Sequence, residues 1–447
     1  MRGLIGMALV FGLCAAPALA CAQSTLSFDE AVAAALSRNR SLQAARSSVS
    51  EAQSAVREAQ SAFYPRITVA ESWQRGDQPV FVFSSLLSSR RFAASNFAID
   101  ALNHPDPIGF FRTSVGVEQV IVDGGRQRSA ATAAALRRDL AAFQADEAAM
   151  DVTVVVATTY GRVLAAQAAR QAADAGVESA REDLARSERR RDAGMATEAE
   201  VLGLRVHMAD LQQRSIQADG DAAVARAELN RMMAAPIDRD YVVADPPSRA
   251  NESLDRDALV AAALEARPSI KASDAAAGLA TTTQRASRAA LIPQLSAQAG
   301  IDMSGTAFND RSSSWLVGGE LRWSFSTGGA ELARMKAAAD AASRARLDLD
   351  DARAVVEVEV VSAIRRLEVA RARRLVGTAA VEQARESQRI IRNRFDAGIA
   401  GTDDVLRAST ALLDAEAQRA SALVDGLVAQ AMLDRAIGRT AAGKGAP

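Results

Sequence analysis

The sequence predicts an exported α+β membrane protein in which one unit of long helices and short strands occurs twice along the chain. The 447 residues are 49% apolar but only 4% aromatic, so alanine, the strongest helix former, supplies much of the apolar surface. Only 11 prolines and 27 glycines interrupt the chain, which favours long elements. The 53 basic and 54 acidic residues nearly cancel, and this balance argues against a nucleic-acid-binding surface.

The first residues have the pattern of a secretory signal. Arg2 gives a basic start, residues 4–16 are mostly apolar, and small residues follow. Both Ala18-Leu19-Ala20 and Ala20-Cys21-Ala22 fit a small-x-small cleavage site. We therefore expect residues 1–22 to be a signal peptide and the mature chain to leave the cytoplasm.

The two cysteines, Cys14 and Cys21, bear on how the mature chain begins. Cys14 would leave with the signal, which excludes an internal disulfide and a thiolate metal cluster. Cys21 could carry the lipid of a bacterial lipoprotein, but Ala18 stands where such proteins usually have leucine. About five residues separate Cys21 from a helix expected at Leu26, a reach of at most roughly 20 Å. This short leader favours an unmodified Cys21.

An internal repeat is the strongest signal in the chain. Residues 26–70 align with residues 254–298 at a shift of 228, and Val32-Ala33-Ala34-Ala35-Leu36 recurs whole at 260–264. From Gly124-Gly125, which matches Gly328-Gly329, the shift becomes 204 and holds to the end of the repeat. Alanine-rich composition alone does not keep one register across two glycine turns, so we take the copies as related.

The two registers divide the chain into segments. After the signal at 1–22, the first repeat covers 23–235, with a helix at 26–63, strands near 66–75 and 112–122, a long helix at 125–190 and a return helix at 198–232. A linker at 236–253 leads to the second repeat at 254–437, with a helix at 254–291, strands near 294–304 and 314–326, a long helix at 329–394 and a return helix at 402–437; a tail follows at 438–447. The shifts differ by 24, which places an insertion, expected as a loop containing His104, between Ala70 and Gly124.

Between the helices of each copy, apolar and polar residues alternate with the period of a strand. The clearest run has its apolar side at Leu295, Ala297, Ala299, Ile301 and Met303. Four such segments of about ten residues suit a transmembrane β-barrel, and the three tryptophans, Trp73, Trp315 and Trp323, fall in them as expected of membrane-interface aromatics. The alternative is a soluble sandwich sheet, but four strands alone bury little core.

Four strands cannot close a barrel around water, because even eight strands fill the interior with side chains. An open sheet edge is not tolerated in lipid. The predicted strands therefore require completion by other chains.

The long helices point to a structure that crosses the periplasm. Residues 125–190 and 329–394 lack proline and nearly lack glycine, and at 1.5 Å per residue roughly 65 residues span about 100 Å. Their faces mix alanine, leucine and valine with arginine and glutamate, which is typical of coiled-coil helices.

The order of elements resembles the outer membrane efflux protein family, the TolC-like proteins. The motifs that carry the resemblance are Leu26…Ala33…Leu36, Tyr64-Pro65 with Ile292-Pro293, Val122-Asp123-Gly124-Gly125 with Phe325-Ser326-Thr327-Gly328-Gly329, and Arg190…Gly194…Val201-Leu202 with Arg394…Gly398…Val405-Leu406. They occur in order and twice over, and the resemblance covers essentially the whole mature chain.

The resemblance implies a homotrimer with a 12-stranded barrel in the outer membrane and a 12-helix tunnel in the periplasm. It implies a passive export channel, with no cofactor and no catalysis, that works with a periplasmic membrane-fusion adaptor and an inner-membrane pump in tripartite efflux or type I secretion. The adaptor would dock at the helical tips, through Arg190, Gly194, Val201, Leu202, Arg394, Gly398, Val405 and Leu406.

The family closes its tunnel at these tips with inward-facing acids. Asp404 stands where members carry one acid, but Arg407 stands where others place a second. The resemblance therefore does not imply a gate of acidic rings here, and Asp403, Asp404 and Arg407 are candidates for an ionic latch instead.

Two other kinds of protein deserve comparison. An enzyme is disfavoured, because Val120–Gly125 lacks the full glycine spacing of a phosphate-binding turn and recurs as a structural corner at Phe325–Gly329. The chain has only His104 and His207, the latter expected on a solvated helix face, and no metal-ligand spacing. A periplasmic coiled-coil adaptor or scaffold is the alternative, but adaptors carry one helical hairpin, whereas this sequence predicts two.

Overall fold

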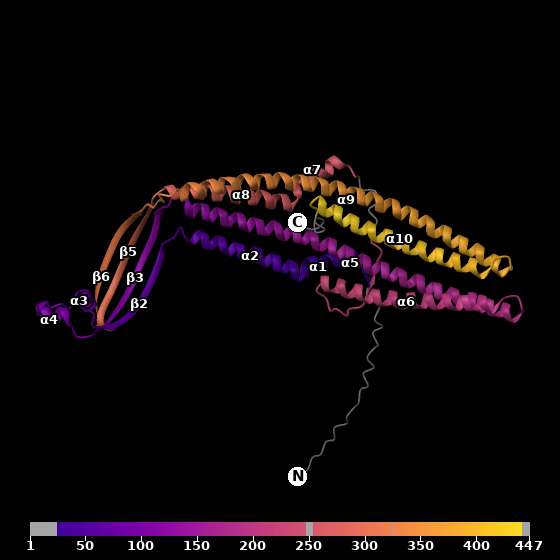
Figure 1. The fold of residues 1–447 in the computed structure, drawn as a ribbon, viewed down its shortest axis with the longest axis horizontal. Coiled ribbons are helices and arrows are strands. Elements are labelled where there is room, and N and C mark those ends of the chain that lie inside the picture. The colour runs from indigo at the N-terminus through magenta and orange to yellow at the C-terminus, as the bar shows by residue number, and fades with distance from the viewer. Residues whose placement is uncertain (1–24, 247–253, 325, 440–447) are drawn as a thin grey trace, which may run out of the picture. The chain divides into compact units, whose positions relative to one another are not determined.

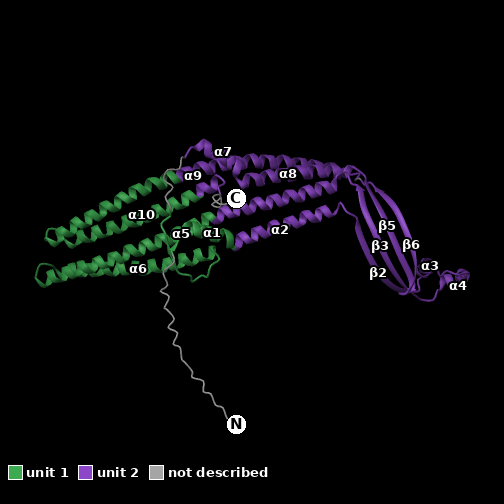
Figure 2. Ribbon diagram, turned by 180° about the vertical axis from the view of Figure 1, so that it is seen from behind, with its two compact units in different colours: residues 1–39, 153–252, 367–431 green, residues 40–152, 253–366, 432–447 purple. Residues whose placement is uncertain are grey.

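The computed structural model describes residues 25–246, 254–324 and 326–439, which form two compact units (Figures 1 and 2). Among the described residues, unit 1 takes in 25–39, 153–246 and 367–431, and unit 2 takes in 40–152, 254–324, 326–366 and 432–439. Each unit thus draws on both sequence repeats. The predicted signal peptide and Cys21 lie outside the described residues.

The elements run in the order that the repeat sets. The first copy contains β1 (Thr25–Leu26), α1 (Phe28–Arg38), α2 (Arg40–Ser61), β2 (Arg66–Gly76), α3 (Pro79–Ser88), η1 (Ala94–Phe97), α4 (Ile99–Asn103), β3 (Ile108–Val122), α5 (Arg126–Asp192) and α6 (Glu198–Met232). The connecting strand β4 (Val242–Val243) pairs with β1, and the second copy contains α7 (Arg256–Ala266), α8 (Pro268–Arg288), η2 (Ala289–Leu291), β5 (Gln294–Ala307), β6 (Asp310–Arg322), α9 (Ala330–Asp396) and α10 (Thr402–Ala436).

The long and return helices keep the repeat register to the residue. Both α5 and α9 have 67 residues, and both α6 and α10 have 35. The helix α9 begins and ends 204 residues after α5, and α10 begins and ends 204 residues after α6. In unit 1 each long helix lies beside its return helix as a hairpin (Figure 1). At 1.5 Å per residue, 67 residues extend for about 100 Å.

The opening helix of each copy is broken, so the single helices predicted at 26–63 and 254–291 are wrong. Asn39 separates α1 from α2, and Arg267 separates α7 from α8. Arg267 precedes Pro268, and a proline disfavours the helical conformation at the residue before it. Asn39 adopts a similar extended backbone, φ −57° and ψ 128°, and its side-chain amide donates to the Met232 carbonyl at the end of α6 over 2.9 Å. Its repeat counterpart Arg267 likewise donates to the Arg435 carbonyl over 2.8 Å in unit 2.

Strands β2, β3, β5 and β6 form one antiparallel sheet in that order (Figure 1). β3 and β5 extend further than predicted at the end away from the helices, where β3 begins at Ile108 and β5 ends at Ala307. The prediction of 314–326 for the last strand is wrong by four residues at each end, because β6 covers Asp310–Arg322. β2 and β6 are the edges, and neither has a second strand partner within the described residues.

The insertion in the first copy is helical rather than a plain loop. It contains α3, η1 and α4, and it packs on the β5–β6 hairpin: Arg90 donates to the Ser313 carbonyl over 3.0 Å, and Ser312 donates to the Ser89 carbonyl over 2.8 Å. Edge-to-face ring contacts join Phe83 to Phe92 and Phe92 to Phe97. His104 ends α4.

One helix, α5, has a segment apolar enough and long enough to cross a membrane by composition alone, and 44% of that segment is buried. Coiled-coil packing accounts for this composition, since Val156, Tyr160 and Val163 are fully buried. The Tyr160 hydroxyl donates to the Leu26 and Ala244 carbonyls over 2.9 and 2.7 Å, and burial raises its pKa to about 12.

Candidate functional surfaces: the two-faced sheet and the helical tips

One face of the sheet is apolar across all four strands. Cross-strand neighbours share a face, and two adjacent rows run across the sheet in register. The first row is Ile67, Val117, Ala299 and Val317, and the second is Val69, Val115, Ile301 and Trp315. Ile67, Val69, Ile301, Trp315 and Val317 are exposed. Exposed apolar rows of this kind suit contact with lipid.

The other face of the sheet carries mostly polar and small side chains. Its rows include Ala70, Ser114, Asp302 and Ser314, and next to them Ser72, Arg112, Ser304 and Ser312. Arg112 pairs with Asp302 over 2.8 Å. A face of serines, glycines and paired charges suits water rather than lipid.

A polar group limits the apolar face on the side away from the helices. Arg311 pairs with Glu71 over 2.9 Å, and both contact the Thr113 hydroxyl. Trp315 lies on the helix side of this group, and Trp323 follows the helix-side end of β6. Eight residues separate them, roughly 27 Å at 3.4 Å per residue, which is close to the height of an outer-membrane apolar band. Trp73 lies beyond the polar group, where the centre of its ring lies 6.3 Å from the centre of the Phe111 ring.

The turns at the tips of both hairpins have one geometry. Gly194 and Gly398 each adopt φ +74°, the left-handed conformation that favours glycine. The Met195 and Ile399 amides donate to the Arg190 and Arg394 carbonyls over 2.7 and 2.8 Å. This is the Schellman end of a helix, in which the residue after the glycine bonds back five positions.

The predicted docking residues differ in burial, and Leu406 is half-buried. Val201 and Val405 are buried and build the tip cores, with Phe395 and Ala400 beside Val405. Leu202 is exposed, and so are Met195 and Ile399. Met195 and Ile399 are not among the residues predicted from the sequence, although an apolar residue after both repeated glycines was a usable signal.

The two tip arginines behave differently. Arg190 crosses to the second hairpin, where it donates to the Phe395 carbonyl over 2.7 Å and its guanidinium lies 4.8 Å from the centre of the Phe395 ring. Its repeat counterpart Arg394 is exposed, and its charge is among those that lower the pKa of Asp404.

Charged side chains join the two hairpins just above the tips. The Asp183 carboxylate on α5 lies 3.4 Å from the Arg392 guanidinium on α9, and the Arg186 guanidinium on α5 lies 3.3 Å from the Asp396 carboxylate on α9. Burial raises the pKa of Asp183, and the charges of Arg392 and Arg186 oppose that rise. The seam between α5 and α9 within one chain is therefore ionic at this level.

The predicted position of His207 on a solvated helix face is wrong. His207 is half-buried where α6 packs against α10, with Nε2 3.3 Å from the Ser409 hydroxyl. Burial lowers its pKa, which favours the neutral ring.

The candidate gate residues are only partly brought together. Arg407 pairs with Asp404 over 2.5 Å within one turn of α10, and the Gly401 amide donates to Asp404 over 3.1 Å. These two hydrogen bonds lower the pKa of Asp404, the Arg407 bond most. Asp403 joins neither of them among the residues that the structure describes.

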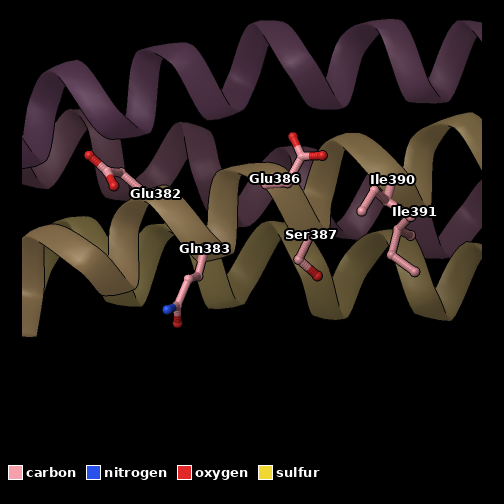
Figure 3. A pocket seen from close by; sticks show the side chains of 6 residues that line it. All are labelled: Glu382, Gln383, Glu386, Ser387, Ile390 and Ile391. Carbon is pink, nitrogen blue, oxygen red and sulfur yellow. The ribbon is translucent and has the colours of Figure 1, made fainter.

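A shallow groove follows one face of α9 above the tip (Figure 3). Its lining consists of Glu382, Gln383, Glu386, Ser387, Ile390 and Ile391, which recur at four-residue steps along that single helix. The groove has the open form of an uncovered helix face, not of an enclosed ligand site.

Neither enzyme-like feature of the sequence forms a site. At the corner before α5 the Asp123 carboxylate accepts from the Gly125 and Gln127 amides over 2.8 and 2.7 Å, so the amides that a phosphate would need are occupied. Within the described residues no cluster of histidine, cysteine and acidic side chains could hold a metal ion.

Comparison with known proteins decides the family. The sequence profile of the outer membrane efflux protein family matches residues 31–235 and 259–439, well over half of the chain. The chain is an outer membrane efflux protein. It is thus a non-enzymatic channel protein of the outer membrane that extends into the periplasm, which confirms the family, the localisation and the absence of catalysis predicted from the sequence.

Solved structures give this efflux protein the TolC-like fold. The outer membrane protein VceC of Vibrio cholerae is 18% identical with a TM-score of 0.75, covering 92% of this chain and 96% of its own. The CmeC channel of Campylobacter jejuni is 16% identical with a TM-score of 0.77, covering 92% and 85%. The open MtrE channel of Neisseria gonorrhoeae is 17% identical with a TM-score of 0.73, covering 92% and 89%. A search of curated protein sequences finds no match.

Proposed function

We propose that three copies of this efflux protein form one duct, with a 12-stranded barrel in the outer membrane and 12 helices lining a tunnel in the periplasm. The observation that carries the proposal is the two-faced sheet with two open edges. Lipid does not tolerate an unpaired edge, so β6 of one copy pairs with β2 of the next. The antiparallel order of the four strands continues through that joint.

The duct is the passive outer part of a tripartite efflux or type I secretion system. A periplasmic adaptor docks at the helical tips, on exposed residues such as Met195, Leu202, Arg394 and Ile399, and an inner-membrane pump supplies the substrate and the energy. Exposed apolar side chains together with an exposed guanidinium suit a protein partner.

Fractionation and conductance test the duct. We expect the protein in the outer-membrane fraction as a heat-modifiable trimer that conducts ions in planar bilayers. A monomer in the soluble periplasmic fraction would reject the duct and support the adaptor or scaffold alternative.

A second measurement tests the gate. The latch proposal now rests on Asp404 and Arg407, which pair within α10. Arg407→Ala leaves Asp404 unpaired at the closed tip, so we expect a changed closed-state conductance in planar bilayers. An unchanged conductance would reject the latch and leave the duct proposal intact.

A further inference from the structure

Charges on the polar face of the sheet occur beside charges of the opposite sign. Toward the outer end of the strands, the Arg112 guanidinium on β3 lies 2.8 Å from the Asp302 carboxylate on β5. Asp310, which follows at the β5–β6 turn, pairs with Arg91 of the insertion. The acids at this end of the face are thus neutralised by arginines.

The helix-side end of the same face has the same arrangement. Arg66 on β2 stands directly opposite Glu118 on β3, and the Arg322 guanidinium lies 2.7 Å from the Glu320 carboxylate on β6. The cross-strand row between the two ends is uncharged in the described strands and consists of Thr68, Gly116, Gly300 and Leu316. The polar face therefore carries charge but no net charge.

Water reaches the Arg112–Asp302 pair, whose side chains are 54% and 35% exposed. The residues beside the pair are small and uncharged: Ser72 and Ser304 stand opposite Arg112, and Ser114 stands opposite Asp302. An exposed ion pair contributes little to stability. Its main physical effect is on the electric field over the wall, because a paired charge cancels the field that a lone charge would project into the water.

We propose that Arg112 and Asp302 determine the charge selectivity of the barrel. As a pair they keep its wall neutral, so that the duct carries cationic, anionic and zwitterionic solutes alike. This rests on the trimer of the proposed function, in which the polar face lines the lumen and each residue occurs three times around it. Loss of one partner leaves a ring of three like charges, and such rings select ions of the opposite sign.

Reversal potentials in planar bilayers test the role of the pair. Under a potassium chloride gradient near 0.1 M, where the screening length is about 10 Å, Arg112→Gln should raise the ratio of cation to anion permeability. Asp302→Asn should lower this ratio, each by about threefold or more relative to wild type, because each leaves a ring of one sign. The variant with both substitutions should return to the wild-type ratio, and Arg112→Lys, which keeps the charge, should not leave it.

The matched control is Arg75→Gln. Arg75 is an exposed arginine near the same end of the sheet, opposite Gly109, but it lies on the face that Trp73 shares and not on the face of Arg112. Its loss should leave the permeability ratio at the wild-type value. Single substitutions of Arg112 and Asp302 that shift the ratio no more than Arg75→Gln, or that shift it in the same direction, would overturn the proposal.

A thiol placed beside the pair measures the field inside the barrel independently of the helical tips. Ser114→Cys, directly opposite Asp302, should react at similar rates with a cationic and an anionic thiol reagent of equal size, measured against the parent chain. Adding Arg112→Gln should favour the cationic reagent, and adding Asp302→Asn the anionic one, each by about threefold or more. A thiol that reacts with neither reagent, or a rate ratio that neither substitution changes, would contradict the proposal.

Failure of this proposal is distinguishable from failure of the proposed function. A wild-type trimer that conducts, but whose permeability ratio and thiol rates ignore both substitutions, would overturn the role of Arg112 and Asp302 alone. A wild-type protein that forms no conducting trimer would overturn the proposed function and the role of the pair with it.

Discussion

At the residue scale, the tips depend on Gly194 and Gly398, whose φ of +74° ends both long helices. The sequence could predict these turns, because Asp-Ala-Gly occurs at both and glycine is the residue that accepts the left-handed conformation. It could not predict that Val201 and Val405 are buried while Met195 and Ile399 are exposed. Which side of a short turn faces the core depends on the packing of the two hairpins, and no local pattern records that.

Gly194→Ala should destabilise the tip by about 1 kcal/mol, the usual cost of a left-handed conformation with a side chain. Space is not the reason, since a Cβ there would meet nothing within 4 Å. The matched control is Gly203→Ala in the interior of α6, where a Cβ also meets nothing and alanine should stabilise by about 0.5–1 kcal/mol. Opposite changes in the thermal midpoint, followed by circular dichroism, are the expected result; destabilisation by both would contradict it.

Asp183 should make the stability of unit 1 depend on pH. Its pKa is raised above the usual 3.8 by burial, so between that value and the raised one the folded chain keeps a proton that the unfolded chain has lost. The stability that Asp183 contributes therefore falls as the pH rises through this window. Asp183→Asn removes the titration, and the variant's thermal midpoint should rise relative to wild type as the pH goes from about 4 to about 7. A difference that stays constant with pH would reject this assignment.

At the element scale, the sequence located both long hairpins but missed the breaks at Asn39 and Arg267. Alanine-rich periodicity continues across both positions, and only Pro268 gave a local signal. The reason for the breaks is tertiary: each residue donates to a carbonyl at the end of a return helix, Met232 for Asn39 and Arg435 for Arg267. The two breaks do stand at the same repeat position, which the shift of 228 could have flagged.

Arg267→Met should cost about 3–5 kcal/mol of stability, as expected when one partner of a buried ion pair is removed. The Arg267 side chain is 2% exposed and lies 3.3 Å from Glu147 and 2.9 Å from Glu359, so the substitution leaves two carboxylates sharing Arg435 alone. The control is Arg353→Met, because the exposed Arg353–Asp350 pair should contribute less than about 1 kcal/mol. Equal thermal midpoints for the two variants would show that the ion pairs of Arg267 with Glu147 and Glu359 do not stabilise unit 2.

At the scale of the whole molecule, the repeat predicted the order of elements, but not how they group. Each compact unit takes segments from both repeats, because a helix of about 100 Å passes through more than one region of packing. The sequence likewise could not show that equivalent faces of α5 and α9 meet different neighbours. That difference arises from the packing of the two hairpins, which the repeat does not record.

The ionic seam between α5 and α9 should respond to salt. The Arg186–Asp396 pair, whose side chains are 27% and 48% exposed, loses part of its attraction when the screening length falls from about 10 Å at 0.1 M salt to about 3 Å at 1 M. Surface pairs of this kind contribute about 0.5–1 kcal/mol, so a within-chain crosslink between His207→Cys and Ser409→Cys, whose native side chains lie 3.3 Å apart, should form about two- to fivefold more slowly at 1 M. Arg186→Gln, added to the within-chain pair, should reduce the salt effect but not abolish it, because the Asp183–Arg392 pair of the same seam remains; a salt effect of unchanged size would place its origin outside the ionic seam.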